Sequence, residues 1–277
     1  MRRAVTRGAA PDHPPRRNRR WAVAGAMLGL ILALVLFAPA AWVASWVASA
    51  TGQRLLLADT RGSVWTGSAR VVLSPGPGSR EASELPERLG WALRPAWIDG
   101  ALGMRLTLDQ SCCIRPASPI TLRAGFGRTT LRLPDATPEQ PWIRWPAGWL
   151  VGLGTPLNTV SPDGLIVLSA QGFVMDGIDG RWQMKGIAQV ELRQFSSRLS
   201  QLAPLGSYRL NLLGGPTPQL MLMTQEGPLQ LSGQGSLGAR IRFQGEAVSA
   251  PGSEAALANL LNIIGRREGA RSIISVG

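Results

Sequence analysis

From about residue 58 to the end of the chain, apolar and polar residues mostly alternate with a period of two. Leu229 and Leu231, for example, alternate with Gln230 and Ser232. Successive side chains of a strand point to opposite faces, so this pattern predicts an antiparallel sheet with one buried and one solvated face. The expected strands are a pair within 60–73, then 89–95, 100–108, 120–124, 129–133, 165–168, 181–192, 207–212, 218–223, 227–233 and 239–245. The fold class is therefore expected to be mainly β.

An interruption divides these strands into two groups. Residues 134–146 form a proline-rich connection, and 149–153 have the composition of a short helix. A similar spacing of glycines around Trp65 and Trp182 recurs in the two groups, each time followed by apolar alternation. This similarity predicts two related curved sheet units in tandem, with subunits of 58–146 and 160–277. Coincidence in a glycine-rich chain is the alternative.

Near the C-terminus the period changes from two to that of a helix. Ser253 is a candidate N-cap and Gly265 can end the helix, so a short C-terminal helix is predicted over 253–265. Residues 271–277 are expected to form a last strand of the sheet. The charged cluster between Gly265 and Gly269 is either a solvated turn or an interaction patch.

The N-terminal region contains a long uncharged segment, 21–53, which is apolar as far as about residue 47. A helix needs roughly 20 apolar residues to cross the ~30 Å hydrocarbon core of a bilayer, so 21–47 is predicted to be a single transmembrane helix. Trp21 and Trp46 lie near its ends, as aromatic residues do at membrane interfaces. Pro39 lies inside the run and can kink the helix or begin an interfacial turn.

A cleaved signal peptide is the alternative interpretation of this segment. Ala48-Ser49-Ala50 resembles a small-residue cleavage site. The apolar core of a signal peptide is only ~7–15 residues long, shorter than the run here, so a retained anchor is preferred.

The net charge of +12 is unevenly distributed along the chain. Residues 1–20 carry seven arginines against one acid, Asp12. Next to an apolar span, the positive-inside rule explains such a tail better than binding to nucleic acid. We therefore expect 1–20 to be a disordered basic cytoplasmic tail and 48–277 to be an extracytoplasmic β-rich domain. The basic residues of that domain are spread thinly, which argues against a nucleic-acid partner.

The two cysteines, Cys112 and Cys113, are adjacent. The preferred interpretation is two small residues at a strand end, one facing each way. A vicinal disulfide is the alternative in an oxidising compartment.

Little in the sequence indicates catalysis. The only histidine, His13, lies in the basic tail, which leaves no catalytic triad and no histidine-based metal site in the β-rich domain. A pair of carboxylates of the glycosidase type stays open, because such residues need not be close in the chain. We expect no enzyme activity, no catalytic, cofactor-binding or metal-binding residues, and no cofactor.

Several motifs resemble those of a known family. They are the N-terminal anchor, Gly62-Ser-Val-Trp-Thr-Gly-Ser-Ala69, Trp91-Ala-Leu-Arg-Pro95 with Asp99-Gly100, Pro204-Leu-Gly-Ser-Tyr-Arg-Leu210, Gly227-Pro-Leu-Gln-Leu-Ser-Gly-Gln-Gly235 and Leu260-Leu-Asn-Ile-Ile-Gly-Arg-Arg-Glu-Gly-Ala-Arg-Ser272. Together they make the sequence similar to the protein N family of the bacterial type II secretion system. The last motif is the most specific, and the basic tail and the cysteine pair depart from the family.

The resemblance implies a single-span component of the bacterial inner membrane, with a cytoplasmic N-terminus and a periplasmic domain. It also implies a non-catalytic role in moving folded proteins from the periplasm across the outer membrane, through contacts with other inner-membrane subunits of the machinery. The alternative is a membrane-anchored groove that binds or transfers lipid along the apolar side of its sheets. A well-filled sandwich would favour the first hypothesis, and a continuous apolar concave face the second.

Overall fold

The computed structural model describes residues 16–79, 81–114, 119–125, 127–178, 181–238 and 241–276. The chain divides after Ala38 into two compact units. The first contains helix α1, Arg16–Leu36. The expected tail therefore lies outside the described residues as far as residue 15, together with His13, and residues 16–20 already belong to the helix.

The uncharged segment is not one helix, which corrects the span expected over 21–47. Helix α1 ends at Leu36, and a separate helix α2, Ala40–Ala50, begins in the second unit. Between them, Pro39 has an extended backbone (φ −71°, ψ 146°) and bridges to Ser63. A proline disfavours helical geometry in the residue before it, so the helix cannot run through this position undisturbed. Within the described residues, no helix combines the length and the apolar character that crossing a membrane requires.

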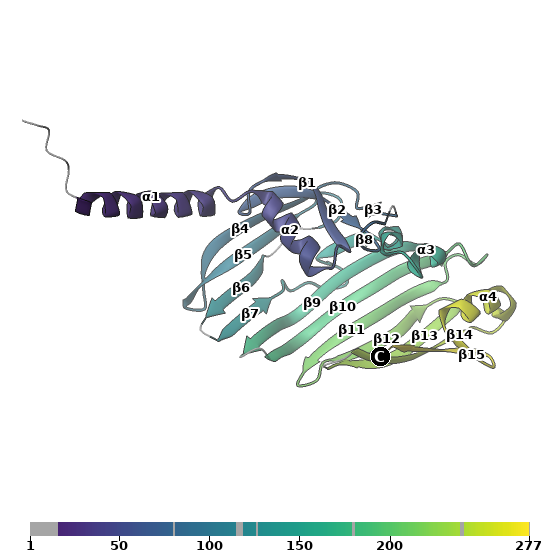
Figure 1. The fold of residues 1–277 in the computed structure, drawn as a ribbon. Coiled ribbons are helices and arrows are strands. Elements are labelled where there is room, and N and C mark those ends of the chain that lie inside the picture. The colour runs from purple at the N-terminus through teal and green to yellow at the C-terminus, as the bar shows by residue number, and fades with distance from the viewer. Residues whose placement is uncertain are drawn as a thin grey trace, which may run out of the picture. The chain divides into compact units, whose positions relative to one another are not determined.

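The second unit is built on one antiparallel sheet of 16 strands, which Figure 1 shows side by side. Along the sheet the order is β1-β2-β4-β5-β6-β7-β9-β10-β11-β12-β13-β14-β16-β15, with β3 beside β2 and β8 beside β9. The strands are β1 Leu55–Gly62, β2 Thr66–Leu73, β3 Ser83–Glu84, β4 Leu89–Ile98, β5 Ala101–Asp109, β6 Ile120–Gly125, β7 Arg128–Arg132, β8 Ile143–Pro146, β9 Pro162–Ile178, β10 Arg181–Ser197, β11 Gly206–Gly215, β12 Gln219–Glu226, β13 Leu229–Leu237, β14 Ile241–Ser249, β15 Arg266–Glu268 and β16 Arg271–Val276. The remaining helices are the 3-10 helix η1, Ala147–Leu153, and the α-helices α3, Leu157–Val160, and α4, Glu254–Ile264.

The sheet runs without a break across the boundary that was expected between two sheet units. Strand β9 is long enough to have two partners on one side: β7 pairs with residues 174–178, and β8 with 165–168. The proline-rich connection therefore returns to the same sheet and does not start a second one. The expected tandem sheets are a single continuous sheet.

Several strands are longer than the sequence predicted, and β9 shows the largest difference: it runs over Pro162–Ile178, whereas only 165–168 were predicted. Strand β4 continues through Pro95, which lies opposite Met104 of β5. Its other neighbour, β2, pairs only with 89–92, so the missing N–H of Pro95 faces no strand. Strand β10 was predicted over 181–192 and runs to Ser197. Its pairing with β9 contains a bulge at Gly186, whose φ is +77°. A Cβ at this position would collide with the carbonyl group of Gly172, so glycine is required.

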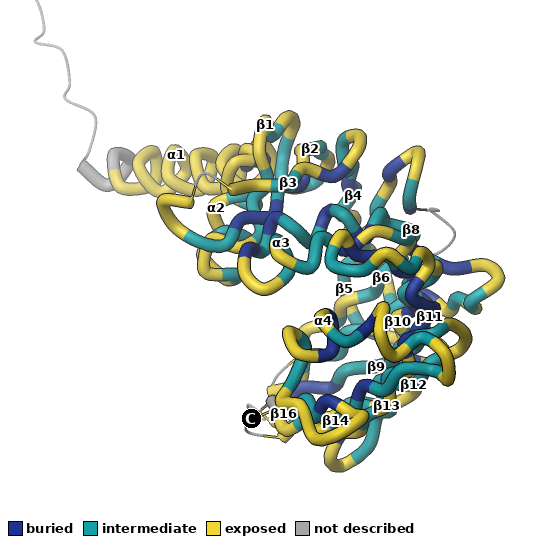
Figure 2. The backbone as a smooth tube through the Cα atoms, turned by 90° about the vertical axis from the view of Figure 1, so that its right-hand side faces the viewer, coloured by how far each residue is buried: buried dark blue, intermediate teal, exposed yellow. Residues whose placement is uncertain are grey.

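Register assigns the strand residues to two faces, because residues directly opposite each other point to the same side. One face, here called the apolar face, carries Trp91 with Leu108, and Val190 with Leu210. The other, the polar face, carries Glu191 with Arg209. Helices α2, η1 and α4 all pack on the apolar face, through separate clusters of buried side chains. They cover only part of it, and Figure 2 accordingly shows mostly half-buried or exposed strands rather than the filled interior of a sandwich.

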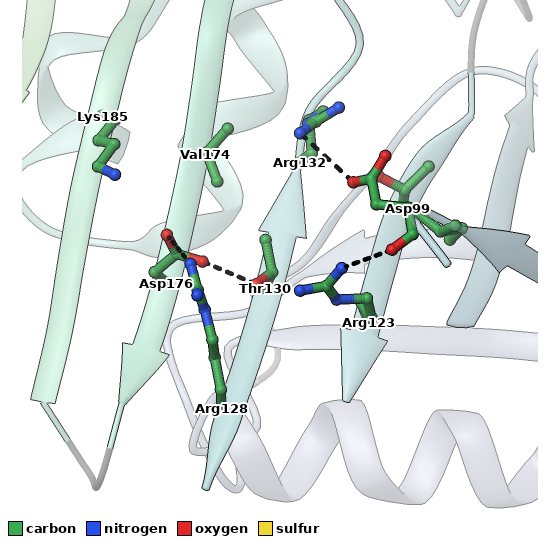
Figure 3. A pocket seen from close by; sticks show the side chains of 10 residues that line it. Asp99, Arg123, Arg128, Thr130, Arg132, Val174, Asp176 and Lys185 are labelled. Atoms are coloured by element: carbon green, nitrogen blue, oxygen red, sulfur yellow. Dashed lines mark hydrogen bonds and ion pairs between the residues drawn. The ribbon is translucent and has the colours of Figure 1, made fainter. Parts of the chain in front are cut away.

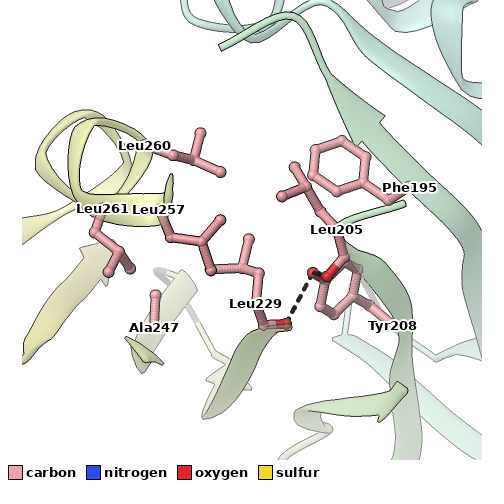
Figure 4. Packing of buried hydrophobic residues seen from close by; sticks show 8 residues of the cluster. All are labelled: Phe195, Leu205, Tyr208, Leu229, Ala247, Leu257, Leu260 and Leu261. Carbon is pink, nitrogen blue, oxygen red and sulfur yellow. Dashed lines mark hydrogen bonds between the residues drawn. The ribbon is translucent and has the colours of Figure 1, made fainter. Parts of the chain in front are cut away.

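The largest cluster lies under α4 (Figure 4). Leu257 and Leu261 are fully buried against Leu229 and Ala247 of the sheet. The helix ends at Gly265 as expected, whereas Ser253 occupies the N-cap position without a side-chain hydrogen bond. The charged segment after the helix is not a turn: it forms the exposed edge strand β15, paired with β16.

The cysteine pair is bridged, with an S–S distance of 2.08 Å, so the preferred interpretation of two unlinked residues was wrong. Strand β5 ends at Asp109, and the cysteines lie in the following turn, not in the strand. The buried Gln110 anchors this turn, since its Nε2 donates to the Pro86 carbonyl (2.7 Å) and its Oε1 accepts from Trp145 Nε1 (3.1 Å).

Candidate functional site

A row of six residues, four of them basic, crosses the polar face of the sheet. Each member is directly opposite the next in the strand register. This basic row reads Arg94, Arg105, Thr121, Arg132, Val174 and Lys185, on β4, β5, β6, β7, β9 and β10. Neighbouring strands lie ~4.8 Å apart, so the row is about 24 Å long.

The basic row contains a pair of like charges, Arg94 and Arg105, in directly opposite positions. Such pairs destabilise a sheet. Both side chains are exposed, as is Lys185. Among the described residues, no carboxylate forms an ion pair with any of these three. The row therefore presents cationic groups that an anion from outside the chain can neutralise.

A cavity of about 310 Å³ adjoins the basic row (Figure 3). It is lined by cations and by two carboxylates, from β6, β7, β9, β10 and the β4–β5 turn. The lining residues are Ile98, Asp99, Thr121, Arg123, Arg128, Thr130, Arg132, Val174, Asp176 and Lys185. With four cations and two carboxylates, the cavity carries a net positive charge.

Asp176 is the buried carboxylate of this cavity, 5% exposed. Thr130 Oγ1 donates to its Oδ1 (2.7 Å), and Arg128 Nη2 donates to its Oδ2 (3.1 Å). The hydrogen bond from Thr130 and then that from Arg128 lower the pKa of the Asp176 carboxyl, against the opposing effect of burial. Asp176 is therefore an ionised counter-charge at neutral pH and not a proton donor.

Asp99 holds the rim of the cavity from the β4–β5 turn. Its φ of +46° places it in the left-handed region, and Gly100 follows it. Its carboxylate lies 3.8 Å from Arg132 Nη2, and its carbonyl accepts from Arg123 Nη1 at 3.4 Å. Because Arg123 bonds only to this neutral carbonyl, its positive charge is not compensated by a described carboxylate.

The cavity and the basic row can bind a charged group, but their side chains offer little for catalysis. In the described part of the chain, no three histidine, cysteine or acidic side chains gather in a way that could hold a metal ion. The two carboxylates of the cavity serve as partners of arginines: Asp176 of Arg128 and Asp99 of Arg132. The site fits the recognition of an anionic group.

A second surface lies on the opposite side of the same strands, where the helices leave the apolar face uncovered. Trp97, Leu102 and Trp182 are 72%, 62% and 57% exposed near the turns of their hairpins. Further along, Val190 and Ile241 are 38% and 54% exposed. Sheets seldom leave so many large apolar side chains on one face without a partner.

Comparison with known proteins resolves the family. Residues 53–274 match the family described as "Type II secretion system (T2SS), protein N". The chain belongs to this family. No curated protein and no solved structure matches the chain. The resemblance inferred from the motifs is confirmed, and the T2SS protein N family gives the chain a role in type II secretion.

The motifs of this T2SS protein N chain have packing roles. Leu205 and Tyr208, from one motif, meet Leu229 from a second and Leu260 from a third in the cluster under α4. The buried Tyr208 hydroxyl lies 2.9 Å from the Leu229 carbonyl, and burial raises its pKa. Three motifs that are far apart in the chain therefore specify one core.

The glycine-tryptophan motif builds the β1–β2 hairpin. A Cβ on Gly67 would lie 2.5 Å from the ring of Trp91, so only glycine leaves room for this indole. Trp91 Nε1 in turn donates to the Val64 carbonyl (3.1 Å) inside the hairpin.

The sequence did not predict the basic row as a site. Each of its arginines occupies an ordinary polar position of an alternating strand, and their proximity appears only once register is known. The recurrence of arginine at these polar positions in successive strands was the signal that could have indicated it.

Proposed function

We propose that this protein is a non-catalytic inner-membrane component of the type II secretion system. In this proposal the N-terminus is cytoplasmic, the β-domain is periplasmic, and other inner-membrane subunits are its partners. The family match over 53–274 carries the proposal. Anchoring is supported by the exposed apolar side chains of α1, among them Leu28, Ile31 and Leu34, which are at least half exposed.

The free edge of β1 is the surface we propose for contact with another subunit. Strand β1 has eight residues and lies at one end of the strand order. At the other end, β15 has three residues, all charged and exposed, which is how native sheets block edge pairing. The longer edge of β1 therefore suits the addition of a strand from a partner.

Deleting the gene is expected to leave the secreted proteins of this pathway in the periplasm, because the machine would lack one of its platform subunits. Immunoblots of periplasm and medium would measure this, with a plasmid copy of the gene restoring export. A periplasmic protein that is not exported serves as the control for leakage. Normal amounts of secreted protein in the medium would reduce the role proposed here to an accessory one at most.

A second candidate function, binding of lipid acyl chains, is favoured by the uncovered apolar face. Across β10, β11 and β12, Ala188, Leu212 and Leu220 are directly opposite one another on this face. The sheet is open at this place. The neighbouring row on the same face consists of Val190, Leu210 and Leu222, and Leu222 packs against the cluster under α4. An aliphatic row of this kind can lie along an acyl chain.

Replacing Leu220 by glutamine is expected to reduce the amount of phospholipid that co-purifies with the protein, because it places an amide in the apolar row. Met221→Gln is the matched control, since the adjacent residue points to the polar face. Mass spectrometry of extracted lipid would measure the difference. Equal lipid in both variants and the wild type would argue against this second function.

A further inference from the structure

Three hairpins end at the same level of the sheet. Ile98 is opposite Ala101, Gly125 is opposite Arg128, and Arg128 is in turn opposite Ile178, which pairs with Arg181. Continuing the β5–β6 register two residues beyond its last pair, Gly103 with Arg123, places Ala101 level with Gly125. The described ends of β4, β5, β6, β7, β9 and β10 at this level thus form a common border, here called the hairpin end. A role in type II secretion does not explain the tryptophans and cations that are exposed along this border, and neither does the cavity alone.

The hairpin end combines exposed tryptophans with exposed cations. On the apolar face, Trp97 and Leu102 lie directly opposite each other, and Trp182 follows on β10. On the polar face, the basic row runs parallel to this border. Arg94 is three residues from Trp97, and Lys185 is three residues from Trp182. At ~3.3 Å per residue, the cations lie about 10 Å behind the tryptophans.

We propose that the hairpin end binds the surface of a bilayer that contains anionic phospholipids. Indole rings favour the interface between headgroups and acyl chains, and interfacial protein segments bury their apolar side chains ~5–10 Å deep there. With Trp97, Leu102 and Trp182 at that depth, the arginines and Lys185 of the basic row reach the level of the lipid phosphates. The cavity of about 310 Å³ beside the row then receives a phosphate, opposite Arg123 and Arg128.

The charge balance of the row supports this partner. Arg94, Arg105 and Lys185 have no described carboxylate partner, and the like-charge pair of Arg94 and Arg105 is relieved when an anion lies beside it. An acidic protein segment would also neutralise the row. Such a segment would leave the tryptophans of the apolar face without a partner. A bilayer contacts both the tryptophans and the cations, so it is the better partner. This inference does not depend on the role proposed in secretion.

A fluorescent probe at the hairpin end tests the proposal. Ala101→Cys places a thiol at the first residue of β5, directly after the β4–β5 turn. Cys112–Cys113 remains bridged without reductant, so Cys at 101 takes up an NBD label alone. The labelled full-length protein is reconstituted into vesicles of phosphatidylcholine, with or without phosphatidylglycerol. We expect blue-shifted, brighter NBD emission only with phosphatidylglycerol, and its loss in high salt, which screens exposed charges.

Two substitutions separate charge from apolar insertion. Arg94→Gln/Arg105→Gln is expected to lower the docking equilibrium about 10- to 30-fold, from the contribution of each basic residue near an anionic surface. This variant also removes a like-charge pair, so folding is not impaired. Trp97→Ala, at a 72% exposed position, is expected to abolish most of the blue shift.

Arg266→Gln/Arg267→Gln is the matched control, because it removes the same charge from β15 at the far end of the strand order. It is expected to leave docking unchanged. Emission that does not respond to phosphatidylglycerol overturns the proposal and leaves an acidic protein segment as the partner of the row. An equal loss of docking in the control variant also overturns the proposal, since the net charge of the protein, and not the hairpin end, would then determine binding.

Discussion

Replacing Leu257 by alanine is expected to lower the free energy of unfolding by ~2–5 kcal/mol, the range measured for fully buried leucines. Leu257 has no exposed surface and contacts the cluster in which α4 covers the sheet. The cavity left by the missing methyl groups cannot be filled easily, because Leu229 and Leu261 around it are themselves fully buried. Urea denaturation of the full-length protein, followed by tryptophan fluorescence, would measure the change.

Ile263→Ala on the same helix is the control for this prediction. Ile263 is 45% exposed, so the substitution changes helix composition without opening a cavity. Its effect is expected to stay within about 1 kcal/mol, since much of the side chain is already in water. If both variants lost the same stability, the packing of α4 on the sheet would not be what stabilises this end of the molecule.

Replacing Glu191 by glutamine is expected to cost about 3 kcal/mol of stability at neutral pH, near the low end for breaking a buried ion pair. The Glu191 side chain is 7% exposed and lies between Arg193 (2.6 Å) and Arg209 (2.7 Å). Glutamine would leave two guanidinium groups without a counter-charge. The arginines keep 37% and 31% exposure, which lets water offset part of this cost.

The effect of Glu191 should depend on pH in a defined direction. Burial alone would raise the pKa of the Glu191 carboxyl, but the hydrogen bonds from Arg193 and Arg209 outweigh it and lower the pKa below its usual 4.5. A depressed folded-state pKa contributes stability above the unfolded value and loses it as pH falls through the folded value. The difference between wild type and Glu191→Gln should therefore be constant above about pH 5 and shrink below 4.5.

The control is Glu246→Gln, which breaks a surface pair with Arg271 at 3.6 Å. Exposed pairs contribute roughly 0–1 kcal/mol, so this variant should be close to wild type at every pH. If Glu191→Gln were as stable as Glu246→Gln, the buried ion pairs of Glu191 would not contribute to the stability of the protein.

The alternating pattern was sufficient to predict most strands, because a half-buried strand needs an apolar residue at every second position whatever its neighbours are. The strand around Leu229 and Leu231 was predicted in this way and confirmed. The change to helical spacing after Ser253 likewise predicted the C-terminal helix, which is confirmed, as is the last strand. The sequence predicts a strand end at Pro95, which is wrong: only the strand order shows that the missing N–H of Pro95 faces no partner strand.

The sequence by itself determined the local structure of this protein and, through its motifs, its family. Periodicity acts between residues close in the chain, and three of the motifs together form one buried cluster of this chain. Only the tertiary structure decided that there is one sheet and not two, since the pairing of β7 with β9 joins strands more than 40 residues apart. The same long-range register brought Arg94, Arg105, Arg132 and Lys185 into one row. Electrostatic recognition depends on distances in space, and no local pattern along the chain contains those distances.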